Sequence, residues 1–536
     1  MTYNLADLFE RVVDAGPERT ALVDATSRWS YVELDDRATQ LAHALSARGV
    51  RRGDHVGIQL RNRSEYIEAM LGAFKISAVP VNVDYRYTDR ELAYLYSDAS
   101  LVALIYGDEF APQVCTALER SPTVRSVIAV GSPHDSRSAI ADCTGYEQAI
   151  AAEGHTRDFK SRSGDDLYLA YTGGTTGLPK GVMWRHEDIF FAAMGGGDPT
   201  TMQGPISAPA EIVDRILPTG TVMLVLPPLI HVSAHWAAFS ILFGGGTVVL
   251  TSGQGLDADE AWRMVEQEHV NILSVVGDAM ARPLLDAVAQ HPDRYDRSSL
   301  FVFASGGAVL SSSTKAQIAA LLPNVIAIDG FGSTETGVSG KRSQMPGAPV
   351  ETHSMFNVGA DLAVLDDELN AVRPGSGVIG QLARRGHMPI GYYKDPVKTA
   401  ATFVELKSER WALTGDAATV EADGSVVLLG RGSASINTGG EKVYPEEVEA
   451  VVKDHPGVFD AVIVGASHER WGEQVVAVVA LRENCSVTLE DVRSHCRAVL
   501  ASYKLPRELF IVDRIVRTTA GKVDYQWARD LVASRR

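Results

Sequence analysis

The chain has 536 residues, more than one hydrophobic core usually serves, so at least two domains are expected. Its composition, 45% hydrophobic and 22% charged, is that of a globular protein and excludes a disordered chain. The net charge of −17 argues against general nucleic-acid binding, which needs a basic surface.

The N-terminal segment predicts a capped helix rather than a secretion signal. Asn4 stands where it can cap a helix whose apolar face is Leu5, Leu8, Phe9, Val12 and Val13. A signal peptide would show an uninterrupted apolar run after early positive charge. No stretch reaches the roughly 18 apolar residues that span a bilayer. The 4 cysteines form no CxxC pair, so neither a zinc site nor a disulfide framework is predicted, and a cytoplasmic protein is expected.

Short β-branched runs alternate with helical patterns through the first four-fifths of the chain. This alternation predicts an α/β fold with a large N-terminal domain of layered, mostly parallel sheets and helices on both faces. The predicted strands are residues 55–60, 102–106, 127–130 and 222–226, and the predicted helices are 34–45, 261–269 and 313–322.

A domain boundary is predicted at the small-residue stretch GRGSAS, residues 430–435, which follows a strand-like run. A small domain on a flexible joint is typical of a lid that moves during a reaction cycle. The predicted units are an N-terminal domain at 1–430, a hinge at 431–435 and a small mobile α+β domain at 436–536.

The strongest single motif is YTGGTTGLPKGV at residues 171–182, after a predicted strand at 167–170. This order places the motif at the carboxyl end of a strand, where α/β sheets bind ligands. Small residues leave backbone N–H groups open to phosphate oxygens, the threonines add hydroxyl donors, and Lys180 adds a positive charge. The motif is not a Walker A loop, because Pro179 precedes the lysine and no Ser or Thr follows it.

This motif resembles the phosphate loop of the superfamily of acyl-CoA synthetases, peptide-synthetase adenylation domains and beetle luciferases. The resemblance then runs in order over almost the whole chain. It implies that the loop binds ATP through Thr172, Gly173, Gly174, Thr175, Thr176, Gly177 and Lys180.

A second segment, DGFGSTETG at residues 329–337, resembles the aromatic-Gly-x-Thr-Glu motif of that superfamily. The resemblance implies that Phe331 stacks on adenine, Thr334 contacts the α-phosphate and Glu335 binds Mg²⁺, a cation that prefers carboxylate oxygen. It also implies that Gly307 and Ala308 form the other wall of the adenine slot and that Asp416 and Arg431 contact the ribose. The other ATP-binding residues that it implies are Asp329, Gly332 and Ser333.

Further matches imply the acyl site and the second half of the reaction. His231, in PPLIH, would lie near the acyl carboxylate, and Lys522, in RTTAGKV, would bridge that carboxylate and the α-phosphate. The implied catalytic residues are Lys522, Thr334, Glu335 and His231. The implied acyl pocket is His231, Trp236, Gly277 and Gly306, the CoA channel is Gly439, Gly440 and Glu441, and the hinge is Ser433.

Several positions depart from the family pattern. Ser433 stands where the hinge usually has Asp or Lys, and Ala434 follows it in place of an acid. Asn437 replaces a frequent lysine, and Val516 replaces a proline near the C-terminal lysine. These departures leave open how the hinge is controlled and which group supports thioester formation.

The resemblance implies an acyl-CoA synthetase, a ligase that uses ATP, Mg²⁺ and coenzyme A and releases AMP and pyrophosphate. Residues 183–198, 277–283 and 436–445 resemble the actinobacterial branch of lipid and steroid-side-chain CoA ligases. The expected substrate is therefore a lipophilic acid, either a steroid side-chain acid or a medium- or long-chain fatty acid. The expected partners are the acid, ATP and CoA, with no nucleic acid and no transmembrane segment; a homodimer is left open.

Two alternatives within the superfamily remain at this stage, an aryl-CoA ligase and a standalone adenylation enzyme that loads a carrier-protein thiol. A non-catalytic acyl- or nucleotide-binding protein is a third alternative. Such a protein would be expected to have lost Lys180, Glu335 or Lys522, and all three are present.

Overall fold

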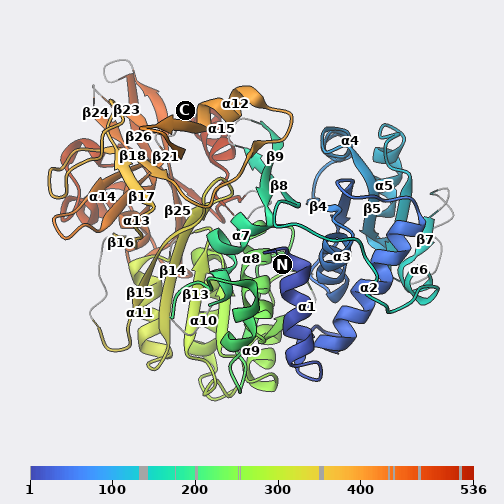
Figure 1. Ribbon diagram of the computed structural model, residues 1–536. Helices are drawn as coiled ribbons and strands as arrows, with labels where there is room; N and C mark the ends of the chain where they lie inside the picture. Colours follow the sequence, from blue (N-terminus) through green and yellow to red (C-terminus); the bar gives the residue numbers. More distant parts are fainter. Residues whose placement is uncertain are drawn as a thin grey trace.

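The computed structural model describes residues 2–131, 140, 143–174, 177–198, 203–251, 253, 255–308, 310–348, 355–431, 435–438, 441–468, 472–517 and 522–536. Within these ranges the strands form three sheets of 14, 8 and 5 strands. Figure 1 shows the N-terminal region in blue at the right, the central region in green below, and the C-terminal region in orange and red at the upper left. The predicted α/β class is confirmed.

The 8-stranded sheet contains residues 171–182, here called the glycine-threonine motif. Its strand order is β19-β9-β8-β4-β3-β5-β6-β7. From β8 to β7 all neighbours run parallel, as predicted, whereas β9 is antiparallel to β8 and β19 is antiparallel to β9. The strands are β3 (His55–Gln59), β4 (Val79–Asn82), β5 (Leu101–Gly107), β6 (Ser126–Val130), β7 (Cys143–Gly145), β8 (Leu167–Gly174), β9 (Gly177–Arg185) and β19 (Gly391–Tyr392).

The 14-stranded sheet has the order β17-β18-β21-β22-β16-β15-β14-β13-β12-β10-β11-β1-β2, with β20 paired to β21. It is parallel from β14 to β1 and antiparallel from β14 to β17. The strands are β1 (Thr20–Val23), β2 (Arg28–Ser30), β10 (Val222–Val225), β11 (Thr247–Leu250), β12 (Ile272–Val275), β13 (Val302–Gly306), β14 (Ile326–Ser333), β15 (Gly337–Gln344), β16 (Met355–Val358), β17 (Leu362–Leu365), β18 (Gly380–Arg384), β20 (Phe403–Leu406), β21 (Glu409–Val420) and β22 (Val426–Arg431).

The 5-stranded sheet belongs to the C-terminal part of the chain and has the order β24-β23-β26-β25, with β27 parallel to β26. Its strands are β23 (Ile436–Thr438), β24 (Glu441–Val443), β25 (Val458–His468), β26 (Gly472–Leu481) and β27 (Glu508–Val512). Valines of β25 and β26 pack on both faces of this sheet, in two separate apolar clusters. The predicted domain bounds at 430 and 435 stay a prediction.

Helices pack on the sheets, and none of those described is long and apolar enough to cross a membrane. The predicted helices fall on α2, α9 and α11. The helices are α1 (Leu5–Ala15), α2 (Tyr31–Ala47), α3 (Ser64–Lys75), α4 (Asp89–Asp98), α5 (Ala111–Leu118), α6 (Tyr146–Ala151), α7 (His186–Ala193), α8 (Val232–Phe243), α9 (Ala258–Gln267), α10 (Gly277–Gln290), α11 (Ser312–Leu321), α12 (Pro396–Thr402), α13 (Pro445–Lys453), α14 (Leu489–Arg497) and α15 (Tyr525–Arg535).

The glycine-threonine motif differs from the expected loop, because most of it is paired strand. β8 continues to Gly174 and β9 begins at Gly177, so the motif forms an antiparallel hairpin in which Thr172 lies opposite Lys180. The hairpin satisfies backbone groups that a long loop would expose. Pro179 lacks the backbone N–H that strand pairing uses. It leaves no gap in the pairing between β9 and β19, because that pairing involves only Val182 and Met183 of β9.

A buried ionic network joins helices α1, α2 and α3. As predicted, the Asn4 side chain caps α1 by accepting from the Ala6 amide at 2.9 Å. Lys75 of α3 is fully buried and lies 2.6 Å from Glu10 of α1 and 2.7 Å from Asp35 of α2. Burial opposes ionisation of Glu10, but Arg162 and Lys75 outweigh it and lower the pKa of this carboxyl.

The C-terminal region contacts the 14-stranded sheet region through Arg282 of α10. This buried guanidinium lies 3.2 Å from Asp278 and donates to the carbonyl of Phe459. Nearby, the Ser313 amide of α11 donates to Asp454 Oδ1 at 3.1 Å. The contact therefore connects α10 and α11 to the end of α13 and the start of β25.

Replacing Lys75 by Met is expected to destabilise the protein by about 3–5 kcal/mol, because it leaves Glu10 and Asp35 buried with one cation fewer. Thermal unfolding measures this loss, with the exposed Lys160→Met as control. The folded pKa of Glu10 is lowered, so its stabilisation is present above the ordinary value of 4.5 and lost as pH falls below it. The gap between variant and wild type should thus narrow in acid; equal midpoints at neutral pH would contradict the prediction.

Candidate active site

The β8–β9 hairpin presents Lys180 toward the start of α12. Lys180 Nζ lies 2.5 Å from Asp395 Oδ2, and both side chains are about one-third exposed, at 37% and 27%. Asp395 also caps α12 by accepting from the Lys398 amide at 2.9 Å. The hydrogen bond from Lys180, followed by that from the Lys398 amide, lowers the pKa of Asp395, which is therefore ionised at neutral pH.

The turn between β14 and β15 carries Thr334 and Glu335. The Glu335 amide donates to Ser333 Oγ at 3.2 Å, and Trp184 of β9 donates its indole N–H to the Thr334 carbonyl at 2.9 Å. Gly332 is required at its position, since a Cβ there would lie 2.0 Å from the Gly337 carbonyl oxygen. Glu335 Oε1 accepts the hydroxyl of Tyr392 at 2.6 Å. The turn is thus attached to β9 and to β19.

The segment from β18 to α12 connects the two motifs. At its start, the buried Arg384 donates to the carbonyls of Thr336 and Val338, the latter at 2.6 Å. Further along, just before α12, β19 pairs with β9 of the hairpin, with Tyr392 opposite Val182. β18 belongs to the 14-stranded sheet and β19 to the 8-stranded sheet, so this segment ties the Glu335 turn to the Lys180 hairpin.

The predicted adenine wall and the predicted acyl pocket meet at Ser305. Its hydroxyl accepts the Gly277 amide at 2.9 Å and donates to the Ala308 carbonyl at 2.7 Å. Gly306 ends β13, and Gly307 has φ +82°, a conformation that favours glycine. The structure therefore brings Gly277, Gly306, Gly307 and Ala308 together at the carboxyl ends of β12 and β13.

Asp329 is buried and forms an ion pair with Lys315 of α11. Its Oδ1 accepts the Leu310 amide at 3.0 Å. Burial, only partly offset by Lys315, raises the pKa of this carboxyl. These contacts make Asp329 a support of the turn after β13, and its predicted role in ATP binding stays a prediction.

The aromatic and ribose positions lie on strands of the 14-stranded sheet, Phe331 on β14 and the ribose positions on β21 and β22. Phe331 packs edge-on against Phe356 with ring centroids 4.6 Å apart. Asp416 of β21 is the partner of Arg431 in β22, and the Asp416 amide donates to Thr414 Oγ1 at 3.0 Å. The two predicted ribose contacts are therefore cross-strand neighbours.

His231 precedes α8 and contacts Arg86. The guanidinium of Arg86 lies 2.9 Å from His231 Nε2 and pairs with Asp84 at 2.9 Å. Arginine can only donate, so Nε2 is the acceptor in this contact. Trp236, one turn further along α8, is buried at 6% exposure among apolar residues.

The other predicted residues either lie on the C-terminal part or fall outside the described residues. Lys522 is exposed beside the β-bridge between Arg517 and Val523, and Glu441 is exposed at the start of β24. Outside the described residues are the predicted ATP-binding Thr175 and Thr176, the predicted hinge Ser433, and the predicted CoA-channel residues Gly439 and Gly440.

Four contacting residues did not emerge from the sequence, namely Tyr392, Asp395, Arg384 and Arg86. The Asp-Pro pair at 395–396 is a visible helix-start signal, and Asp395 does cap α12. Asp395 and its ion-pair partner Lys180 are 215 residues apart in the sequence, so no local sequence pattern predicts the pair.

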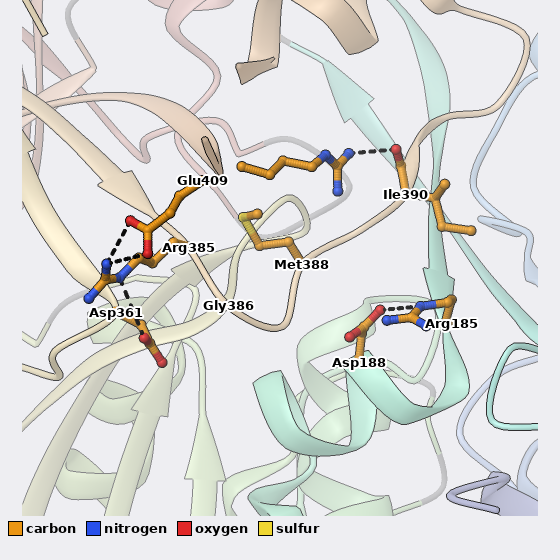
Figure 2. A pocket seen from close by; sticks show the side chains of 9 residues that line it. Arg185, Asp188, Asp361, Arg385, Gly386, Met388, Ile390 and Glu409 are labelled. Carbon is orange, nitrogen blue, oxygen red and sulfur yellow. Dashed lines mark hydrogen bonds and ion pairs between the residues drawn. The ribbon is translucent and has the colours of Figure 1, made fainter. Parts of the chain in front are cut away.

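A pocket of about 600 Å³ lies beside the connecting segment but is separate from the predicted nucleotide residues. Figure 2 shows ion pairs among its charged side chains. Arg385 lies 2.7 Å from Glu409, and Arg185 lies 2.6 Å from Asp188. Arg410 donates to the carbonyl of Ile390 at 2.6 Å. This compensation argues against an anion site there.

Comparisons with known proteins agree with the arrangement. The model of the AMP-binding enzyme family matches residues 9–393, and that of the AMP-binding enzyme C-terminal domain matches residues 447–522. A 3-oxocholest-4-en-26-oate–CoA ligase of Rhodococcus rhodochrous is 44% identical, covering 100% of this chain and 97% of the relative. A medium/long-chain-fatty-acid–CoA/3-oxocholest-4-en-26-oate–CoA ligase of Mycolicibacterium smegmatis is also 44% identical, with coverage of 100% and 97%.

Solved structures share the fold. The anthranilate CoA ligase AuaEII in complex with anthranoyl-AMP has a TM-score of 0.84 at 23% identity, covering 100% of this chain and 99% of that one. ATP-bound MatB from Rhodopseudomonas palustris has a TM-score of 0.80 at 24% identity, covering 99% of each chain. The protein is an AMP-forming acid–thiol ligase. The chain belongs to the AMP-binding enzyme family, as an acyl-CoA synthetase whose substrates include ATP and CoA.

Replacing Arg384 by Met is expected to loosen the Glu335 turn, because the carbonyls of Thr336 and Val338 lose a buried donor. We expect a loss of about 1–3 kcal/mol in stability together with slower pyrophosphate release. Thermal unfolding and a pyrophosphate assay measure the two effects. The exposed Arg373→Met is the matched control, and an Arg384 variant with wild-type rate and midpoint would refute the anchoring role.

Proposed function

We propose that this protein adenylates a lipophilic carboxylic acid, either a steroid side-chain acid or a medium- or long-chain fatty acid, and transfers the acyl group to CoA. The observation that carries the proposal is the 44% identity, over essentially the whole chain, to ligases named for those acids. The three resembling segments at 183–198, 277–283 and 436–445 point to the same class. The proposal includes a cytoplasmic location and leaves a homodimer open.

The chemistry follows from the reluctance of a carboxylate to react with a thiol. In the first half-reaction, a carboxylate oxygen attacks the α-phosphorus of ATP and pyrophosphate leaves. In the second, the CoA thiolate attacks the acyl carbon and AMP leaves with the bonding electrons. Adenylation thus makes the acyl carbon electrophilic. It also replaces oxide, a poor leaving group, by AMP, a good one.

The residues present fit a magnesium ion that is held mostly by the nucleotide. Among the described residues, no three acidic, histidine or cysteine side chains gather into a metal cage. Glu335 offers one carboxylate beside the predicted phosphate site, which suits Mg²⁺ bound by one or two carboxylates plus phosphate oxygens. When bound, the ion would supply charge neutralisation on the phosphates.

The remaining roles are assigned to the chain's own side chains. Lys180 would bind the phosphates from the β8–β9 hairpin, and Thr334 and Glu335 would face them from the β14–β15 turn. His231, held by Arg86, would lie near the acyl carboxylate. Lys522 would enter on the C-terminal domain and bridge the carboxylate and the α-phosphate during adenylation. The predicted hinge at Ser433 would then let Glu441 and its neighbours approach the thiol.

The substrate assignment is tested by pyrophosphate release and thioester formation over a panel of acids. We expect the highest kcat/KM for steroid side-chain and medium- or long-chain fatty acids, with thioester formed only when CoA is present. Higher kcat/KM for benzoate-type acids would replace the proposal by an aryl-CoA ligase. Adenylate formation without any CoA thioester would favour the carrier-protein alternative.

Replacing Lys522 by Ala is expected to slow adenylation about a hundredfold or more, because one preorganised charge is lost at the developing negative charge. Conversion of a presynthesised acyl-adenylate to the thioester should remain near the wild-type rate. Single-turnover assays of each half-reaction measure the split. Arg529→Ala, an exposed cation on the neighbouring α15, should match wild type in both; equal losses of both half-reactions in Lys522→Ala would reject the assigned role.

A further inference from the structure

The segment of residues 391–399 contacts both groups assigned to the phosphates and the metal. Tyr392 donates its hydroxyl to Glu335 Oε1 at 2.6 Å, and Asp395, three positions on, lies 2.5 Å from Lys180 Nζ. Glu335 and Lys180 come from different sheets, and Tyr392 and Asp395 come from one short strand and the cap that follows it. Neither Tyr392 nor Asp395 is among the site residues that the family resemblance implies.

Tyr392 is held rigidly enough to orient its partner. The residue is only 4% exposed, and its amide donates to Thr399 Oγ1 at 2.9 Å. The ammonium of Lys398 lies 4.0 Å from the centre of the phenol ring, and the ring of Phe403 packs at 6.1 Å. The Glu335 side chain, by contrast, has several rotatable bonds, so a fixed donor on Oε1 limits where its carboxylate points.

A phenol on one carboxylate oxygen leaves the second oxygen as the atom that can bind a metal. Hydrogen bonds of this kind, made to a ligand from outside the metal's own ligand set, fix the ligand's orientation. Their removal typically costs about 10–100-fold in metal affinity or activity. Tyr392 stands in that relation to Glu335.

Asp395 stands in a different relation to Lys180. The pair is partly exposed, so water and salt weaken it, and a triphosphate carries far more negative charge than one carboxylate. An arriving nucleotide can therefore take Lys180 from Asp395. Asp395 itself stays in place, because it also caps α12 through the Lys398 amide.

We infer that Tyr392 and Asp395 position the nucleotide site: Tyr392 orients Glu335 toward the metal, and Asp395 holds Lys180 beside the phosphate site until ATP replaces it. The inference rests on the proposed function, since it takes Glu335 as the metal ligand and Lys180 as a phosphate ligand.

Calorimetric titration of ATP, with Mg²⁺ and with EDTA, tests the Tyr392 half. Tyr392→Phe keeps the ring and the strand pairing, so we expect about tenfold or greater loss of affinity for Mg-ATP and unchanged affinity for metal-free ATP. In the pyrophosphate assay, half-saturation by Mg²⁺ should rise. Tyr393→Phe, which loses the hydroxyl of a ring packed 5.0 Å from His55, is the matched control and should behave as wild type. Wild-type Mg-ATP affinity in Tyr392→Phe overturns the orienting role, as does an equal loss with and without Mg²⁺.

Glu335→Gln separates this inference from the proposed function. If its Mg²⁺ titration matches wild type, Glu335 is not the metal ligand and that part of the proposed function fails. If Glu335→Gln shifts the titration and Tyr392→Phe does not, only the positioning role of Tyr392 fails. Parallel shifts in both variants are the expected result.

Asp395→Asn tests the second half, because asparagine caps a helix as well as aspartate does while carrying no charge. With the competing carboxylate gone, ATP should bind severalfold more tightly, with Mg²⁺ and with EDTA alike. Unchanged or weaker binding overturns the holding role of Asp395. A thermal midpoint equal to wild type verifies that α12 is still capped.

Discussion

The passage of the chain from β18 to β19 is the constraint on which the site depends. β18 belongs to the sheet that carries the Glu335 turn, and β19 belongs to the sheet that carries the Lys180 hairpin. Arg384 attaches the start of this passage to the turn, and β19 attaches its end to the hairpin. Together with the hydrogen bond from Trp184 of β9 to the Thr334 carbonyl, this passage ties together two motifs that lie on sheets sharing no strand.

Electrostatics explain how an acidic protein handles a polyanionic substrate. The net charge of −17 gives no general attraction for phosphate, so binding relies on local donors. Two of the cations around the site are already matched by a carboxylate, Lys180 by Asp395 and Arg86 by Asp84. Such pairs keep cations ordered in the absence of ligand, and a more highly charged ligand can exchange for the carboxylate. In the pocket of Figure 2, Arg185 and Arg385 are likewise paired with carboxylates, those of Asp188 and Glu409.

The C-terminal region is attached differently from the two N-terminal sheets. Its contact with α10 and α11 uses the buried guanidinium of Arg282, the carboxylate of Asp454 and backbone carbonyls and amides. The N-terminal sheets share a continuous apolar core that includes α1, α3 and α8. A small polar contact of this kind is compatible with reorientation, because little apolar surface has to be exposed when it opens.

The sequence was enough for the local structure and, through its resemblance to a known superfamily, for the reaction class. Asn4 capped α1 and strands followed the β-branched runs, while the resemblance carried by the two motifs with Lys180 and Glu335 implied adenylation, which the family match confirmed. These features are local in sequence, where periodicity, capping and motif chemistry can be read directly. Tertiary structure decided the rest: β9 returned along β8 as a hairpin, and Asp329 turned inward to Lys315. It also brought Tyr392 to Glu335, 57 residues away in the sequence, and Asp395 to Lys180, 215 residues away. Such contacts are decided by sheet pairing and packing between distant segments, so no local sequence pattern predicts them.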